Sequence, residues 1–540
     1  MSERADIQRQ TVTPAPRGGA AWTLLGGLIA GAGAFGTIIF AHEVNTKYVA
    51  VVLMAALTLM MRPLVGNLRL FSLYMILLLA PLGLRMSFLR VPHMGGAGAM
   101  FVEAVDPFLL LLLYYQVRDR FKGVGHRYRF PPACAWWTAL IVLGIGTVLF
   151  GPLRTTAANE VVRMLKLLLL ALLVVNEVIL RKQFQQVTVA LMLGVILESI
   201  IALTQYMSGA QLGLGFLGES SDEDIKVLSE GSLSTREFVY RVGGLLGHAN
   251  LLAGYLALFL PAAVALLLAR VSLQLKLLLA VTLMVGQPAL VLTLSRAGWV
   301  DFSVAFLIVL ALGASHPGSR KRFMLARGVI IVGTVAVALA LSPKIIQRLT
   351  VADPNSVEYR IKWMKTARAM IIDNPVFGTG LNHYVFAQLP YAEQKTATEM
   401  TEVYGDYWPA VHNSWMITWA EQGTVGFLLY LAMHIAVIAV GLRNLRIRDP
   451  MMHALSVGLL AGFIAIMIDG LASFFVRQEA TARMFWIALG LILAIGYWRR
   501  DNEEGVTLID EPAAEPDRSA IASEAGDKSR WLPYRESILR

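Results

Sequence analysis

The sequence predicts an all-α membrane protein, a polytopic bundle of about 12–14 transmembrane helices. Hydrophobic residues make up 56% of its 540 residues and charged residues only 16%, too few to cover the surface of a soluble protein of this size. Long stretches such as 167–175 and 256–268 are apolar on every helical face. Helices are the expected form there, because hydrocarbon offers no hydrogen-bond partners to the backbone.

Windows of about 20 apolar residues divide the chain into roughly fourteen predicted spans. These begin near Ala20, Tyr48, Leu68, Met100, Ala133, Asn159, Gln186, Ala249, Leu275, Ala297, Gly328, Asn413, Met451 and Arg483. If the N-terminus is cytoplasmic, every loop predicted to lie inside is basic, from Arg62 and Arg69 to Arg499 and Arg500. This agreement with the positive-inside rule supports the order of the spans. It also explains the net charge of +10 without a nucleic-acid partner.

Two long outer connections interrupt the membrane domain, which we expect to cover residues 20–500 between a cytoplasmic tail at 1–19 and a disordered cytoplasmic tail at 501–540. The first connection, 208–246, carries the acidic stretch Glu219–Asp224, and the second covers 342–411. Long ordered loops often carry function. Both connections lie on the non-cytoplasmic side, which for a bacterial inner membrane is the periplasm, and we expect the functional site there.

A helix is predicted inside the second connection, over Ser356–Ile372, and Asn374-Pro375 ends it. Its predicted apolar stripe contains Val357, Ile361, Met364 and Ile371. Such a helix can lie on the membrane surface with its basic side chains on lipid phosphates. That placement remains compatible with a substrate-binding role for Arg360.

Four motifs place ionisable side chains at the outer side. They are Arg241 in R-V-G-G-L-L-G-H-A-N, Arg296 in T-L-S-R-A-G-W, Arg360 in Y-R-I-K-W and His412 in V-H-N-S-W. A single arginine at the membrane edge can simply extend its charge into the interface. Three arginines and a histidine on one side favour an anion site, because guanidinium groups make paired contacts with phosphate and stay protonated.

A lipid-linked sugar diphosphate would need only one further group at such a site. Its leaving group is already a weak base, whereas the acceptor hydroxyl must lose a proton to a general base. His412 suits that role because nearby arginines disfavour its imidazolium form, although a helix-capping or interfacial histidine is the alternative. His248 and His383 are weaker candidates. Glu421 is not expected to pair with His412, since nine helical residues turn about 900° and separate their faces.

The remaining polar residues have structural predictions. Asn413 is expected to cap the helix that follows it, and Glu421 to meet a polar group of a neighbouring span. Glu160, Arg163 and Lys166 are expected to form an internal ion cluster. Asp222-Glu223-Asp224 matches a metal-binding D-x-D pattern, but three such residues are common by chance in an acidic loop.

At these residues the chain resembles the O-antigen ligase and polymerase superfamily, the WaaL and Wzy proteins. Residues 360–384, R-I-K-W-M-K-T-A-R-A-M-I-I-D-N-P-V-F-G-T-G-L-N-H-Y, resemble the family's large periplasmic loop. Residues 412–427 resemble its H-N-x-x-L-x-x-x-x-E-x-G-x-x-G segment, with Met416 in place of leucine. R-V-G-G-L-L-G-H-A-N and L-S-R-A-G resemble two further family patterns, so the resemblance covers about 241–442.

The resemblance implies a GT-C-like glycosyltransferase that needs neither a metal nor another cofactor and inverts the transferred sugar. The donor would be a glycan on undecaprenyl diphosphate, and the acceptor another glycan or lipid A–core, with membrane lipids and a chain-length regulator as further candidate partners. His412 would be catalytic, and Arg241, Arg296 and Arg360 would bind the diphosphate. The supporting residues would be Asn413, His248, Asn250 and Glu421.

Three functions stay open at this point. The long first connection and the number of spans favour a repeat-unit polymerase over a ligase. The ligases that this chain resembles have roughly twelve spans, against about fourteen predicted here. A flippase or transporter also has many spans and intramembrane charges. The halves of this chain show no convincing internal repeat, and two long connections on one side favour a one-sided site over alternating access.

Overall fold

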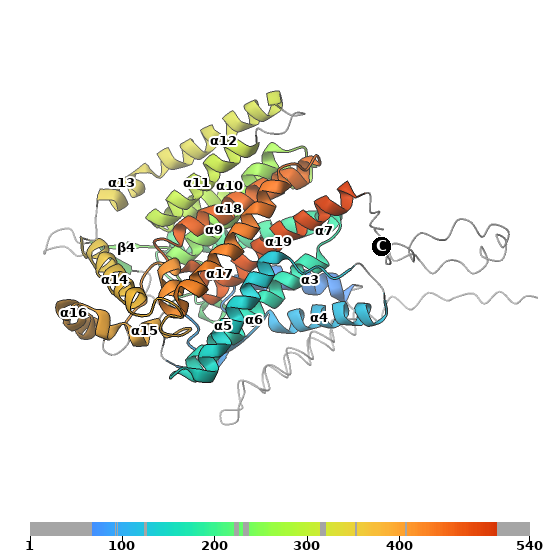
Figure 1. Ribbon diagram of the computed structural model, residues 1–540. Coiled ribbons are helices and arrows are strands. Elements are labelled where there is room, and N and C mark those ends of the chain that lie inside the picture. Colours follow the sequence, from blue (N-terminus) through green and yellow to red (C-terminus); the bar gives the residue numbers. More distant parts are fainter. Residues whose placement is uncertain are drawn as a thin grey trace, which may run out of the picture.

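The computed structural model describes residues 67–504, except 92, 94, 124–126, 221–225, 230–236, 314–319, 351–353 and 405–407. These residues form a bundle of α-helices (Figure 1), which confirms the predicted fold class. Strands occur in the described part only as two short antiparallel hairpins. Seven described helices are long and apolar enough to cross a membrane, as expected for a multi-pass membrane protein.

The first part of the bundle contains the helices and strands before the first long connection. They are α3 Leu68–Leu79, β1 Arg85–Phe88, β2 Met100–Glu103, α4 Asp106–Phe121, α5 Pro132–Phe150, α6 Arg154–Glu177 and α7 Arg181–Ser208. The connection that follows contains η1 Gly215–Leu217, β3 Lys226–Ser229 and β4 Glu237–Tyr240.

The second part carries the remaining long helices and the second connection. Its long helices are α9 Ala249–Leu268, α10 Leu273–Leu292, α11 Arg296–Leu312, α12 Arg320–Ala340, α17 Ser414–Asn444, α18 Pro450–Asp469 and α19 Glu479–Glu503. The shorter elements are α13 Ser342–Thr350, α14 Pro354–Asp373, α15 Tyr384–Ala387, η3 Leu389–Tyr391, α16 Gln394–Tyr404 and η4 Phe475–Arg477.

Some predicted elements differ from the structure or lie outside it. The tail at 1–19, the first two spans, Asp222–Asp224 and residues 505–540 lie outside the described residues. The fourth span, predicted to begin near Met100, instead starts as strand β2 and becomes helical only at Asp106-Pro107. The β2 strand pairs with β1 from Arg85↔Glu103 to Phe88↔Met100, and this pairing prevents an earlier helix.

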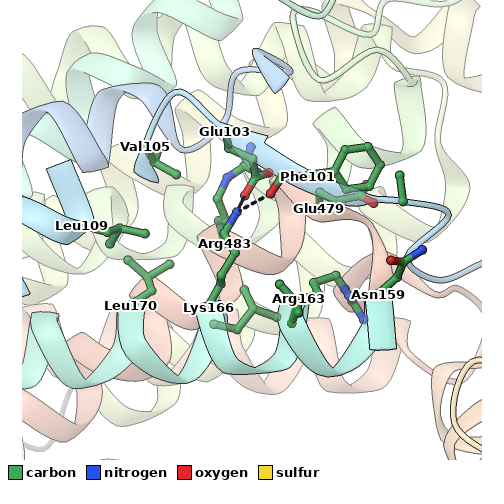
Figure 2. Close-up of a pocket in the computed structure, with 13 residues that line it drawn as sticks. Phe101, Glu103, Val105, Leu109, Asn159, Arg163, Lys166, Leu170, Glu479 and Arg483 are labelled. Carbon is green, nitrogen blue, oxygen red and sulfur yellow. Dashed lines mark hydrogen bonds and ion pairs between the residues drawn. The ribbon is translucent and has the colours of Figure 1, made fainter. Parts of the chain in front are cut away.

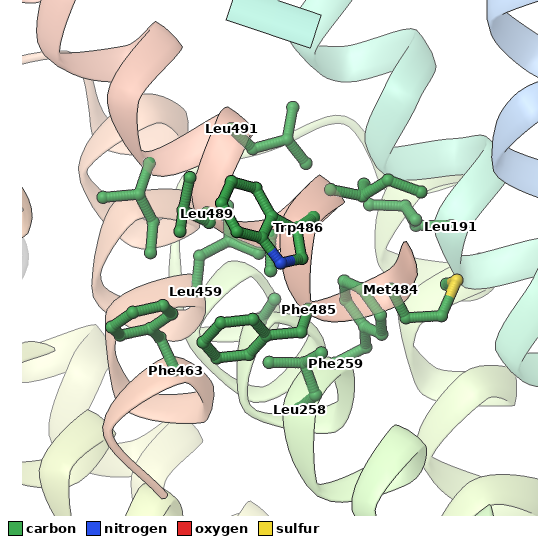
Figure 3. Close-up of a cluster of buried hydrophobic side chains, with 14 of the residues drawn as sticks. Leu191, Leu258, Phe259, Leu459, Phe463, Met484, Phe485, Trp486, Leu489 and Leu491 are labelled. Carbon is green, nitrogen blue, oxygen red and sulfur yellow. The ribbon is translucent and has the colours of Figure 1, made fainter. Parts of the chain in front are cut away.

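Three helices, α9, α18 and α19, form the centre of the bundle. Helix α18 carries G-L-L-A-G, and Gly458 and Gly462 lie directly against the α9 backbone, where an added Cβ at Gly462 would be 2.0 Å from the Leu258 carbonyl oxygen. Small residues spaced four apart permit this close approach of two helices. Figure 3 shows the adjoining apolar cluster, in which Phe463 of α18 and Phe485 of α19 stack with ring centroids 4.9 Å apart.

The second connection folds as a group of helices at one end of the bundle (Figure 1). The predicted helix is present as α14, and its predicted apolar stripe is confirmed in part: Met364 and Ile371 pack against the buried cluster, whereas Ile361 is 47% exposed. The buried residues are Trp363, Ala367 and Met370, which pack against residues from α15, α17 and the segment before α17. Apolar residues occur on more than one face of α14, so their spacing alone did not identify the packed face.

A break in α17 receives the chain segment that follows α14. Gly423 has φ +63° and ψ −169°, which interrupts the helix. Thr424 N donates to Pro375 O at 2.8 Å, and Gly380 N donates to Glu421 O at 2.8 Å. These backbone bonds satisfy groups that the break leaves without intrahelical partners. They also fix α14 relative to the start of α17.

We expect Gly423→Ala to lower the free energy of unfolding by more than about 1 kcal/mol, because alanine disfavours positive φ. An added Cβ would also lie 2.2 Å from Val376 O. Thermal unfolding of the purified protein in detergent measures the effect. Gly146→Ala on α5 is the matched control, since a Cβ there meets nothing within 4 Å. Equal Tm values for the two variants would contradict this account of the break.

Candidate functional site

Several helix ends meet at the end of the bundle that carries the second connection. Arg241, which follows β4, reaches both the C-cap of α10 and the start of α9. Ser414 N, at the start of α17, donates to Gly470 O at 2.9 Å just beyond α18. Gly254 of α9 lies against the ring of Phe475 in η4. The predicted site motifs are therefore brought to one end of the bundle.

Arg241 is half-buried and joins two of these helix ends. Its Nε donates to Thr293 O at 2.9 Å, and one terminal nitrogen donates to Asn250 Oδ1 at 2.7 Å. Asn250 was predicted as a supporting residue, and here it orients the guanidinium. These two bonds hold the guanidinium at this end of the bundle.

Side chains of α7 hold the glycine-rich turn after Arg241, residues 242–247, by hydrogen bonds to its backbone. Glu198 accepts from Leu245 N at 2.9 Å, and Gln205 both accepts from Gly244 N at 2.9 Å and donates to Glu219 at 2.7 Å. Gly244 has φ +59°, and a Cβ there would lie 2.5 Å from a Glu198 carboxylate oxygen. The turn therefore needs glycine for both its conformation and its contact with Glu198.

Arg296 is the first residue of α11, three residues after the carbonyl that Arg241 holds. Ser295 caps the helix by accepting from Gly298 N at 3.4 Å. The Arg296 side chain is half-buried and makes no hydrogen bond or ion pair with the residues that the structure describes. A guanidinium at a helix N-terminus without an internal carboxylate partner is suited to an anionic ligand.

His412 lies just before the N-cap of α17, between two aromatic rings. Trp363 of α14 stacks on it at a centroid distance of 5.1 Å and an interplanar angle of 12°, and Phe474 lies 4.9 Å away at 60°. Burial lowers the pKa of His412 to about 4, with further lowering from the nearby Arg360 and His248. The ring is therefore neutral at pH 7 and able to accept a proton.

The structure thus brings His412, Arg360 and His248 close together, although their motifs are far apart in sequence. His248 is exposed and caps α9, with its Nδ1 accepting from Asn250 N at 3.1 Å. Its neutral form then carries the proton on Nε2 and can only donate there. His383, the other candidate base, is buried with both ring nitrogens 3.1 Å from backbone carbonyls, so its place is structural.

Asn413 and Glu421 support the site without touching its ionisable groups. Asn413 Oδ1 accepts from Met416 N at 2.9 Å as the predicted N-cap, and its amide donates to Leu471 O beyond α18. Glu421 pairs with Arg477 at 2.9 Å and accepts from Tyr384 N at 3.2 Å. Glu421 does not pair with His412, as predicted, but its partner Arg477 lies in η4, between two spans, and not within a neighbouring span.

A pocket lies between β2, α4, α6 and α19 (Figure 2). Lys166 pairs there with Glu103 and Asp106, both at 2.8 Å, and Arg483 also pairs with Glu103. Glu160 and Arg163 form an ion pair as predicted, but the prediction that Lys166 joins them is wrong. The cations of this pocket are already neutralised by carboxylates, so it is a poor site for a diphosphate.

Sequence reasoning missed four residues at the site. Trp363 and Phe474 could not be identified from the sequence, because nothing in their spacing connects them to His412. Asp301 of α11 and Asp469 at the end of α18 are buried, adjoin each other, and the charge of Arg360 acts on Asp469. A signal existed for these two, since acidic residues inside apolar helices are usually functional.

The comparison with known families matches part of the chain. The profile of the Wzy_C family, described as O-antigen ligase, matches residues 279–431. This range begins within α10, ends within α17 and contains Arg296, Arg360 and His412, whereas Arg241 precedes it. A search of curated proteins gave no match.

We expect Glu421→Ala to lower the free energy of unfolding by about 3 kcal/mol, because it leaves the charge of the buried Arg477 without its closest partner. Glu358→Ala is the matched control, since the carboxylate of its ion pair with Lys362 is 63% exposed. Its loss should change stability by less than about 1 kcal/mol. Denaturation of both purified variants in detergent measures this. Equal stabilities would show that the Glu421 pair does not hold this end of the bundle.

Proposed function

Because the chain is a member of the O-antigen ligase and polymerase superfamily, we propose that it transfers a glycan from undecaprenyl diphosphate to an acceptor sugar, as a Wzy-type repeat-unit polymerase. One observation carries the proposal: a neutral imidazole, His412, lies beside the guanidinium of Arg360 at the end of the bundle where Arg241 and Arg296 also lie. An anion site beside a proton acceptor is what this transfer needs.

In the proposed reaction, Arg241, Arg296 and Arg360 bind the donor diphosphate. The acceptor hydroxyl attacks the anomeric carbon from the face opposite the diphosphate and forms the new glycosidic bond. The bond from the anomeric carbon to the phosphate oxygen breaks, and its electron pair leaves with undecaprenyl diphosphate. The acceptor proton passes to His412, so the configuration at the anomeric carbon inverts.

The charge of the donor adjusts the basicity of His412. Burial and the charge of Arg360 lower the pKa of His412 to about 4, so it is neutral but a weak base. A bound diphosphate opposes the effect of Arg360 and raises this pKa towards neutral pH, where a general base is most effective. Transfer should therefore fail as the pH falls through the pKa of His412 in the donor complex.

The same proposal covers the cellular setting. Arginines supply the positive charge that a metal ion supplies in other glycosyltransferases, so the transfer is proposed to be metal-independent. The protein would lie in the bacterial inner membrane with both termini cytoplasmic and this end of the bundle periplasmic. Its partners would be the lipid-linked donor, the acceptor glycan, membrane lipids and a chain-length regulator.

Ligation to lipid A–core is the second candidate, and the description of the matching family as O-antigen ligase favours it. Polymerase and ligase share the donor, the leaving group and the base, and differ in the acceptor alone. The long acidic first connection and the number of predicted spans support the polymerase.

The glycan profile of a deletion strain tests both levels of the proposal. Loss of a polymerase should leave single repeat units and no long chains, whereas loss of a ligase should leave full-length polymer on undecaprenyl diphosphate. Complementation with the wild type should restore the profile. Arg241→Ala, Arg296→Ala and His412→Ala should each fail to restore it at normal protein level.

Arg296→Lys should restore it only in part, because an ammonium cannot make the paired contacts of a guanidinium. Arg446→Ala is the matched control, since Arg446 is exposed beyond the far end of α17. Long polymer left on undecaprenyl diphosphate in the deletion strain would contradict the polymerase assignment and support the ligase. Full complementation by His412→Ala would remove His412 as the base.

A further inference from the structure

The imidazole of His412 is held in an unusual way for a general base. Most catalytic histidines have one ring nitrogen bonded to a carboxylate or carbonyl, which fixes the ring and its tautomer. Here Nδ1 is buried and has no hydrogen-bond partner among the described residues. The Ala410 carbonyl acts on the pKa of the ring in the raising direction, but no hydrogen bond of normal geometry reaches Nδ1.

Two aromatic rings pack against this imidazole. The Trp363 indole is nearly parallel to it, at 12°, and the Phe474 ring is tilted against it, at 60°. His412 is still half-exposed as a residue, while its Nδ1 is buried. Because Nδ1 is the buried nitrogen, Nε2 is the ring nitrogen that can serve as the base.

The two aromatic side chains are themselves firmly placed. Trp363 is 8% exposed, and the Tyr359 ring stacks on it with ring centroids 6.2 Å apart and an interplanar angle of 27°. The Trp363 carbonyl accepts from the hydroxyl of the fully buried Tyr384 at 3.5 Å. Phe474 precedes η4, and its carbonyl accepts from Arg477 N at 2.9 Å, so Glu421 holds this segment through Arg477.

We propose that Trp363 and Phe474 form an aromatic clamp on the imidazole of His412, and that they are positioning residues that hold its plane with Nε2 towards the acceptor hydroxyl. The inference rests on the proposed function in one respect, the role of His412 as base. Stacking fixes the ring plane, so the lone pair on Nε2 points along a single direction. The acceptor hydroxyl must then approach within the plane of the ring.

The clamp also keeps water away from the faces of the ring and so contributes to the burial that lowers the pKa of His412. The charged groups around it are Arg360 from α14, His248 from the start of α9 and Asp469 from the end of α18, whose carboxylate interacts with Arg360. Removing one aromatic face leaves all three in place. A change in the pH profile then reports on burial.

Two substitutions at one position separate stacking from simple volume. Trp363→Phe keeps an aromatic face, whereas Trp363→Leu keeps an apolar side chain without one. We expect Trp363→Phe to stay within about threefold of wild-type kcat and Trp363→Leu to lose about tenfold or more, with little change in KM for the donor. The acid limb of the Trp363→Leu profile should move to higher pH, since a more hydrated imidazole is protonated more easily.

A measurement that needs no turnover accompanies the kinetics. Diethyl pyrocarbonate reacts with neutral imidazole, and peptide mass spectrometry measures its rate at His412 in the purified full-length protein. Trp363→Leu and Phe474→Leu should both speed this reaction, and Trp363→Phe should not. Trp136→Leu is the control, because Trp136 on α5 is 44% exposed and should change neither readout.

The outcomes separate the clamp from the catalytic role of His412. If His412 is modified faster in Trp363→Leu while His412→Ala keeps full activity, the two aromatic rings position His412 but His412 is not the general base. Unchanged kcat, acid limb and modification rate in a folded Trp363→Leu protein would overturn the clamp. If Trp363→Leu does not fold, Phe474→Leu decides by the same three readouts.

Discussion

The carboxylate of Glu421 is the contact on which the geometry of this end of the bundle depends. One oxygen accepts from Tyr384 N at the start of α15, and the other pairs with Arg477 at the end of η4. Arg477 is buried, donates to Gly95 O and lies 4.0 Å from Glu160. A single buried acid in α17 therefore fixes two segments that are distant in sequence. One carries Tyr384, whose hydroxyl donates to the Trp363 carbonyl, and the other carries Phe474, which packs on His412.

Cations inside the bundle are paired with carboxylates, whereas Arg296 at its end is not, within the described part of the chain. Carboxylates neutralise Lys166, Arg163 and Arg477 inside the bundle, where an unpaired charge would be costly. Arg296, at the end of the bundle, has no such partner among the described residues. A guanidinium without a carboxylate partner in a partly buried environment is suited to an anion, because water competes less there.

The fold class could be predicted because apolar composition and basic inner loops follow directly from the membrane. The N-cap at Asn413 and the separation of Glu421 from His412 could also be predicted, since both depend on local helix geometry. The partner of Glu421 could not, because Arg477 lies 56 residues away in sequence. Helix spacing likewise failed on α14, where Trp363 was not recognised as the buried contact of His412.

The central claim is that a lipid diphosphate binds at this end of the bundle beside His412. Electron cryomicroscopy of the protein in nanodiscs with a non-hydrolysable undecaprenyl-diphosphate glycan tests it most directly. The account predicts phosphate density about 3 Å from the guanidinium groups of Arg296 and Arg360, with the anomeric carbon facing the Nε2 edge of His412. Phosphate density in the pocket of Lys166 and Arg483, or anywhere remote from His412, would contradict it.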